Sequence, residues 1–149
     1  MGLALTDLKL IDLLRGLPLL VKDDFEGTFT YNLVLKEVDG KRVEKDKYWV
    51  KISPGKCEWG EGHTTEPGAC VFTISRGGVD TIIAMQVYGL EAATKAMLMG
   101  YIFTNNVKAA EKWFKILKIG KKDFFDSLAK SGFELTDTKV KVAGELGIE

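Results

Sequence analysis

The side chains best suited to catalysis lie in a glycine-rich segment, residues 60–68. This segment holds His63, the only histidine of the chain, with Glu61 and Glu66 nearby. An imidazole beside carboxylates can transfer protons or bind a metal ion. A metal site or a catalytic triad needs further partners, however, and the chain offers no second histidine and no closely spaced cysteine pair. The sequence therefore favours an exposed loop here.

Two other patterns could carry chemistry. Cys57 and Cys70 are too far apart for the usual spacing of zinc ligands, and we expect both to be reduced. Gly77 and Gly78 precede a predicted helix, as in a phosphate-binding loop, but the Lys-Ser or Lys-Thr ending of such loops is missing. The glycine-flanked serine of hydrolases is missing too. We therefore predict a protein that is not an enzyme and that binds no cofactor or metal.

Composition narrows the class of protein further. A chain of 149 residues is expected to form one domain whose core needs no disulfide. With 21 basic and 21 acidic residues the net charge is zero, which disfavours nucleic acid as a partner. We find no signal sequence, no apolar run of about 18 residues that would span a bilayer, and no peroxisomal tripeptide at the end. The expected location is cytoplasmic.

The first half of the chain is predicted to form a sheet. Alternation over residues 28–38 places Phe29, Tyr31, Leu33 and Leu35 on one face. Turns at Asp39-Gly40 and at Pro54-Gly55 separate this strand from strands over 48–52 and 56–61, and a fourth strand covers 69–75. Trp49 is out of phase, so it either covers the back of the sheet or contacts a partner.

Helices follow in the second half. Apolar spacing predicts helices over residues 79–87 and 90–99, closed by Gly89 and Gly100, then a strand over 101–104 and a helix over 107–117. The last helix has apolar side chains on about half of its circumference and lysines on the other half. Strands first and helices later indicate an α+β fold, with a single layer of about five mostly antiparallel strands covered by helices.

The two ends of the chain are less strongly patterned. A leucine-rich helix is expected over residues 5–22, which docks onto the core or contacts lipid. Residues 121–149 form a C-terminal extension, with a short helix that ends near Gly132 and a small strand or ordered tail over 138–142. We expect this extension to pack on the domain or at a dimer interface.

The succession of elements from residue 69 to 117, with Gly89, Leu90, Gly100 and Asn106 at its turns, resembles the sterol carrier protein 2 family of lipid-transfer domains. The resemblance covers about residues 25–119, so the predicted lipid-binding domain is 1–120 with its core at 25–120. It departs from the family pattern at Tyr88 and Asn105. It implies a sterol carrier-like fold with a lipid-sized cavity, a hydrophobic tunnel between sheet and helices.

The resemblance implies binding and intracellular transfer of fatty acids, fatty acyl-CoA, sterols or phospholipids, without catalysis. Methionines and aromatic residues suit a cavity that accepts varied chains, although a loosely packed core uses the same residues. The candidate lipid-binding residues are Leu33, Val79, Ile82, Ile83, Met85, Met97, Met99, Tyr101, Phe103, Ala110, Trp113, Phe114 and Leu117. Lys108, Lys112 and Lys115 are candidates for contact with an anionic head group or a membrane surface.

Two other functions stay open at this stage. The domain could be an accessory module of a larger lipid-metabolising assembly, for which an exposed apolar patch around Trp49 and Phe124 would speak. It could also be an enzyme, with His63 as its acid or base. A homodimer is a further possibility for its assembly.

Overall fold

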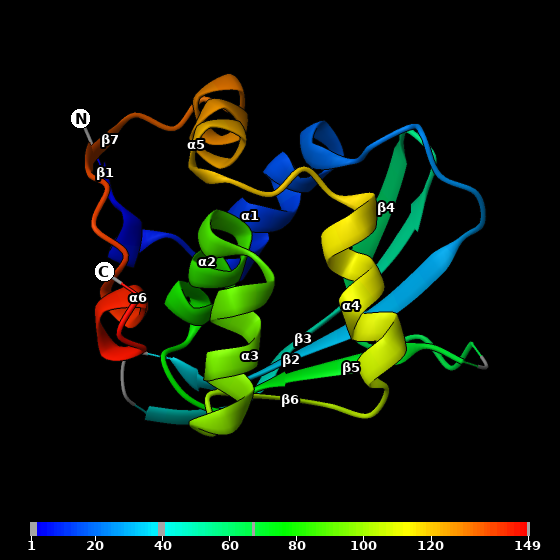
Figure 1. The fold of residues 1–149 in the computed structure, drawn as a ribbon, viewed down its shortest axis with the longest axis horizontal. Helices are drawn as coiled ribbons and strands as arrows, with labels where there is room; N and C mark the ends of the chain where they lie inside the picture. Colours follow the sequence, from blue (N-terminus) through cyan, green and yellow to red (C-terminus); the bar gives the residue numbers. More distant parts are fainter. Residues whose placement is uncertain (1–2, 39–40, 67, 149) are drawn as a thin grey trace.

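The computed structural model describes residues 3–38, 41–66 and 68–148, which form an α+β fold with helices gathered against a five-stranded mixed sheet (Figure 1). The strands are β1 (Leu3–Ala4), β2 (Phe29–Val38), β3 (Lys41–Ser53), β4 (Lys56–Glu61), β5 (Cys70–Ile74), β6 (Ile102–Thr104) and β7 (Leu135–Asp137). The helices are α1 (Leu10–Gly16), α2 (Val79–Tyr88), α3 (Leu90–Leu98), α4 (Val107–Ile116), α5 (Lys121–Lys130) and α6 (Lys141–Glu145), with the 3-10 helices η1 (Leu5–Asp7) and η2 (Leu17–Leu20).

The main sheet has the strand order β4-β3-β2-β5-β6. The pairs β2–β3, β3–β4 and β5–β6 are antiparallel, whereas the central pair β2–β5 is parallel. This parallel pair departs from the expected succession of antiparallel strands. It arises because the chain leaves β4 at one edge and crosses to the far side of β2 before β5 begins. The predicted turn at Asp39-Gly40 lies outside the described residues.

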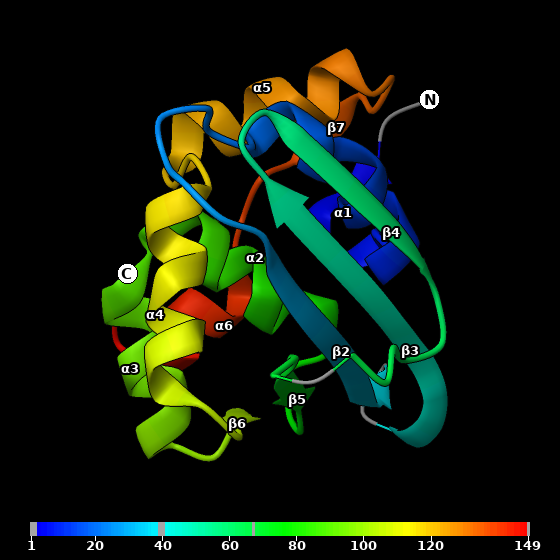
Figure 2. The ribbon, with the colours of Figure 1, turned by 90° about the vertical axis from the view of Figure 1, so that its right-hand side faces the viewer.

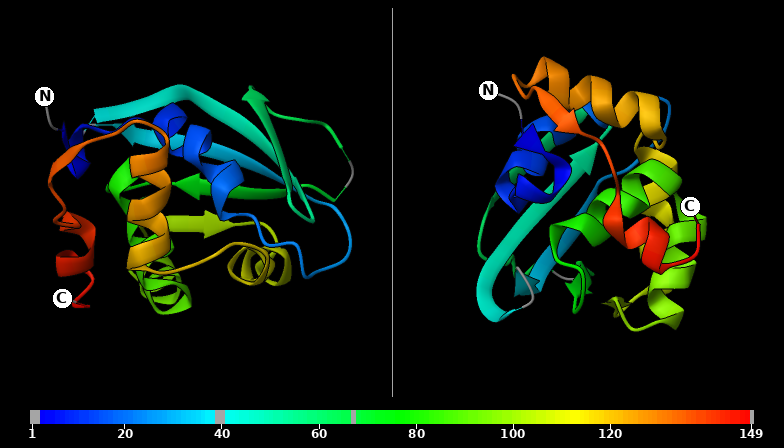
Figure 3. Two further views of the ribbon diagram at one scale, coloured as in Figure 1. Left: turned by 90° about the horizontal axis from the view of Figure 1, so that it is seen from above. Right: turned by 90° about the vertical axis from the view of Figure 1, so that its left-hand side faces the viewer.

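One face of the sheet carries the core. Burial alternates along β5, where Cys70, Phe72 and Ile74 are buried and the residues between them are half-buried. Tyr31 and Leu33 of β2 are buried on the same face, as the alternation predicted. The helices lie on this side of the sheet, and views from other directions show the same arrangement (Figures 2 and 3).

The leucine-rich segment near the N-terminus is not one helix. The structure divides residues 5–22 into η1, α1 and η2, with Lys9 extended before α1. Pro18 explains the second break, because proline has no N–H to donate and its ring clashes with the carbonyl of an α-helical turn. Leu10, Leu13 and Leu14 of α1 are buried, so this segment packs on the core.

The C-terminal residues pack on the same body. Helix α5 contacts α1, α2 and η2, and α6 contacts α2. β7 pairs in parallel with β1, so the C-terminal segment lies beside the start of the chain (Figure 1). The small strand or tail predicted over residues 138–142 is wrong, because α6 begins at Lys141 and the strand lies earlier, at Leu135–Asp137.

Candidate functional site

An apolar cleft lies between α3 and α4, next to β6 at the edge of the sheet. Figures 1 and 2 show how these elements are arranged. Two helical stripes with the same spacing face each other across it. The lining residues are Leu90, Ala93, Thr94 and Met97 of α3, Val107, Ala110, Glu111 and Phe114 of α4, Met85 of α2, Phe72 of β5, and Ile102, Phe103 and Thr104 of β6. Each stripe follows the i, i+3, i+4, i+7 pattern, which places its members on one face of the helix.

Local sequence signals position the two walls. Helix α4 starts at a capped end, where the side chain of Asn106 accepts a hydrogen bond from the Ala109 N–H at 3.1 Å. Helix α3 is bracketed by Gly89 and Gly100, whose φ angles of 71° and 78° favour glycine. The chain can therefore turn sharply at both ends of α3 and lay it beside α4.

The cleft is small and its walls are deformable. Its volume is about 60 Å³, whereas an engineered cavity that holds benzene measures roughly 150 Å³. The lipid-sized cavity expected from the sequence is therefore larger than this cleft. Met85 and Met97 contribute flexible thioether side chains, which adapt to different shapes. A ligand larger than a few methylene groups requires the walls to move apart.

Exposed apolar side chains concentrate around the cleft. Of the eight large apolar side chains that are exposed in the described part of the chain, six lie between residues 90 and 107. We call these six the apolar rim: Leu90, Met97, Leu98, Met99, Phe103 and Val107. Leu98 is 83 % exposed and Phe103 is 53 % exposed. Exposed apolar side chains gathered in one short segment are typical of a surface that contacts a membrane or another protein.

Five of the predicted lipid-binding residues line the cleft, namely Met85, Met97, Phe103, Ala110 and Phe114. Leu33, Ile82, Ile83, Trp113 and Leu117 are buried in the core, where Val79 packs against them. Met99 belongs to the apolar rim. Tyr101 turns away from the cleft, because its hydroxyl donates to Glu145 Oε1 at 2.8 Å and its ring lies under the Arg76 guanidinium.

An aromatic cluster forms the floor behind the cleft. The ring of Trp113 meets Tyr31 edge-on at 5.0 Å and Phe72 at 5.7 Å, measured between centroids. Its indole N–H donates to Gln86 Oε1 at 2.6 Å, while Gln86 Nε2 has no partner among the described residues. Only Phe72 of the three rings also lines the cleft. The cluster therefore fills the space where a longer tunnel would run.

The three candidate head-group lysines do not share one position. The ammonium of Lys112 lies 5.4 Å from the centre of the Phe29 ring, a cation–π contact on the side of α4 away from the cleft. Lys108 and Lys115 are exposed and, seven residues apart, lie on one face of α4 next to its cleft-lining stripe. These two remain candidates for contact with an anionic surface.

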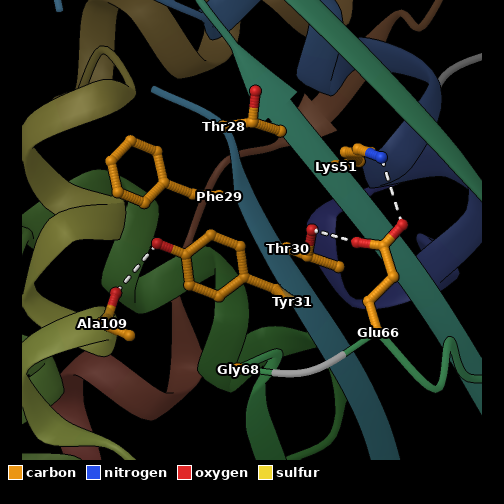
Figure 4. Close-up of a pocket in the computed structure, with 8 residues that line it drawn as sticks. All are labelled: Thr28, Phe29, Thr30, Tyr31, Lys51, Glu66, Gly68 and Ala109. Carbon is orange, nitrogen blue, oxygen red and sulfur yellow. Dashed lines mark hydrogen bonds and ion pairs between the residues drawn. The ribbon is translucent and has the colours of Figure 1, made fainter. Parts of the chain in front are cut away.

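A larger and more polar hollow, about 390 Å³, lies at the start of β2 (Figure 4). On one side of the strand, Thr30 donates to Glu66 at 2.9 Å and Lys51 Nζ lies 3.1 Å from its other oxygen. These contacts, with Lys51 the stronger, lower the pKa of the Glu66 carboxyl. On the other side, Tyr31 donates to the Ala109 carbonyl oxygen at 2.9 Å. The polar groups named here thus satisfy one another.

The candidate catalytic groups are dispersed. His63 is exposed, with Nε2 3.2 Å from the Leu33 carbonyl oxygen, and it lines a hollow with Lys36 and Lys47. Burial, with a smaller effect from Glu58, raises the pKa of the Cys57 thiol to about 12, which keeps it protonated at neutral pH. Among the described residues, no three His, Cys, Asp or Glu side chains form a group that could hold a metal.

Several cleft residues escaped the sequence analysis, above all Leu90, Thr94, Val107 and Glu111. A signal for them existed, because each belongs to a helical stripe that also contains a predicted residue. The apolar periodicity of α4 does not single out its cleft stripe, because the most apolar face of the helix points into the core through Trp113 and Ile116.

Comparison with protein-family models, with curated proteins and with solved structures gave no match to this chain. The resemblance to the sterol carrier protein 2 family therefore rests on the sequence pattern alone. Within residues 3–38, 41–66 and 68–148, no helix combines the length and the apolar character needed to cross a membrane.

Proposed function

We propose that this protein binds and carries a hydrophobic ligand with an aliphatic chain, of the fatty acid, fatty acyl-CoA, sterol or phospholipid type, without changing it chemically. The observation that carries the proposal is the apolar cleft between α3 and α4, which the side chains of Leu90, Met97, Phe103 and Val107 line at its mouth. Resemblance to the sterol carrier family supports the same function independently of the cleft. Selection would be by length and volume, because apolar contacts have no directional preference.

Opening of α3 is the step that such binding requires. Of its own residues α3 buries only Ala92, Ala93 and Ala96, whose methyl groups contribute about 2 kcal/mol, and moving it also exposes the parts of α2 and β6 that it contacts. A chain of about fifteen methylenes gains roughly 12 kcal/mol when it leaves water. This gross gain offsets the cost of exposing those surfaces, and Gly89 and Gly100 are suitably placed hinges.

The alternative of an accessory module predicted an exposed apolar patch around Trp49 and Phe124. Phe124 is only 3 % exposed and packs edge-on against Phe125. Trp49 is half-buried and its ring lies against Gly60 of the neighbouring strand, where a Cβ would come within 2.6 Å of the indole nitrogen. These placements favour the carrier over the module.

The first experiment is mass spectrometry of an organic extract of the purified protein, together with native mass spectra of the intact protein. We expect a stoichiometric lipid, or micromolar binding of a fluorescent fatty acid by the empty protein. Incubation should leave the ligand's mass unchanged. An empty extract combined with no binding of the fluorescent probe would refute the proposal.

A substitution that fills the cleft tests the location. Ala110 and Ala93 lie on opposite walls, so Ala110→Leu or Ala93→Leu should weaken binding of the fluorescent fatty acid by about tenfold or more while the protein stays folded. Ala129→Leu, on the exposed side of α5, is the matched control and should bind normally. Normal binding by both cleft variants would place the ligand elsewhere.

A further inference from the structure

We propose that the apolar rim docks onto a lipid bilayer that contains anionic lipids, so that the cleft opens directly into the membrane. The inference rests on the proposed lipid-binding function and names the partner of the same site. Two features of the described residues carry it: the position of the rim and the charge of the segment that contains it.

The rim has the geometry of a membrane-inserting surface. The side chains of Met97, Leu98 and Met99 end α3, and Phe103 and Val107 follow on β6 and α4. The end of α3, β6 and the start of α4 lie along one edge of the molecule (Figure 1), so these exposed side chains belong to neighbouring segments. Leucine, methionine and phenylalanine side chains are suited to the boundary between head groups and acyl chains.

The charge of this segment complements an anionic surface. Residues 90–118 contain five lysines and two glutamates, a net charge of +3 in a chain whose net charge is zero. Lys95 is paired with Glu91 at 3.5 Å, and Lys112 lies on the Phe29 ring. Lys108 directly follows Val107 of the rim, and Lys115 lies two turns further along the same face of α4. Both are exposed and take part in no ion pair within the described residues. Such lysines are attracted to the negative leaflet surface.

Docking by the rim would also solve the problem of ligand entry. A single acyl chain that crossed water to reach the cleft would lose its apolar environment on the way. When the rim lies in the bilayer, α3 can move away from α4 while its apolar outer side chains stay in hydrocarbon. A second protein chain would satisfy the apolar rim equally well, but the excess of lysines in residues 90–118 favours anionic lipid.

The test is co-flotation of the full-length protein with vesicles of phosphatidylcholine alone and with about 30 % phosphatidylserine added. We expect binding to the anionic vesicles that weakens as salt is raised. Leu98→Ser should weaken this binding about tenfold. Leu19→Ser, at a leucine that is 45 % exposed on η2, is the control and should float like the parent protein.

Charge is tested in the same assay. Lys108→Glu combined with Lys115→Glu should abolish the preference for anionic vesicles, while Lys130→Glu, an exposed lysine on α5, should not. Failure of the parent protein to float, or equal behaviour of Leu98→Ser and Leu19→Ser, would overturn the inference. Self-association of the parent that Leu98→Ser abolishes would also overturn it and assign the rim to a second copy of the chain.

Ligand binding measured without vesicles separates the two proposals. Leu98 does not line the cleft, so Leu98→Ser should bind a water-dissolved fluorescent fatty acid as the parent does. Normal fatty acid binding without flotation refutes docking and leaves the carrier function standing. Flotation that depends on Leu98 without fatty acid binding refutes the carrier function and leaves docking standing.

Discussion

Helices α2 and α3 follow each other directly in the chain, separated by Gly89, yet they are anchored in very different ways. Eight of the ten residues of α2 are buried, including Ile82, Ile83 and Val87. In α3 only three alanines are buried, while Leu90, Met97 and Leu98 are exposed. Helix α2 is therefore a central part of the core, whereas α3 packs on the core through small alanine side chains only. Movement is expected where local stability is low, so of these two helices α3 is the one expected to move.

The largest effect should come from truncating the buried face of α2. Ile83 is fully buried, so Ile83→Ala should lower the free energy of unfolding by about 3 kcal/mol through lost burial and a residual cavity. Ala96→Gly, at a buried position of α3, should cost about 1 kcal/mol, mainly through helix propensity. Urea denaturation of both variants measures the difference. Equal losses would mean that α3 is anchored as firmly as α2.

The link between α2 and α4 should give the next largest effect. Trp113→Phe removes the donor to Gln86 Oε1 and leaves the buried amide of Gln86 with no partner for its oxygen, at a cost of about 2 kcal/mol. Gln86→Leu in turn leaves the indole N–H of Trp113 without its acceptor. The double variant loses both groups together, so we expect it to be more stable than the sum of the single losses implies. Additive losses would show that the hydrogen bond contributes little.

Differences in burial also explain which features of the fold could be predicted from the sequence. Alternation in β5 was readable because Cys70, Phe72 and Ile74 are buried and the residues between them are only half-buried. Helix α2 was readable from the spacing of its apolar residues, although it is buried on nearly all sides. The parallel pairing of β2 with β5 was not readable, because it joins segments far apart in the chain through the path of a loop. Trp113 and Leu117 were predicted to bind lipid but are buried in the core, because periodicity identifies an apolar face but not the element that covers it.

A pH series tests how the C-terminal helix is attached to α2. Asp80 Oδ2 accepts the Val142 N–H at 2.6 Å, and burial raises the pKa of its carboxyl, with the Val142 and Lys141 contacts opposing and Glu145 adding to the shift. A raised pKa in the folded state means that the contribution of Asp80 to stability is full below its ordinary pKa near 3.8 and is lost as the pH rises through the folded pKa.

Asp80→Asn keeps the acceptor for the Val142 N–H but removes the charge. We expect the variant to match the parent protein below pH 3.8 and to become relatively more stable as the pH rises, as measured by urea denaturation at several pH values. Asp80→Ala, which leaves the Val142 N–H without its acceptor, should be less stable than Asp80→Asn at every pH. A difference between Asp80→Asn and the parent that does not change with pH would contradict the assigned role of burial.

The smallest effect is expected on the outer side of α3, and it is the most discriminating. Leu98 is 83 % exposed, and alanine has at least as high a helix propensity as leucine, so Leu98→Ala should change the free energy of unfolding by about 0.5 kcal/mol or less. Leucine at this position would then serve contact with something other than the core of its own chain. A loss of more than about 1 kcal/mol that grows with protein concentration would instead indicate that α3 is buried between two copies of the chain. In that case the contrast between α2 and α3 would hold only for the isolated protomer, and the apolar rim would belong to a dimer interface.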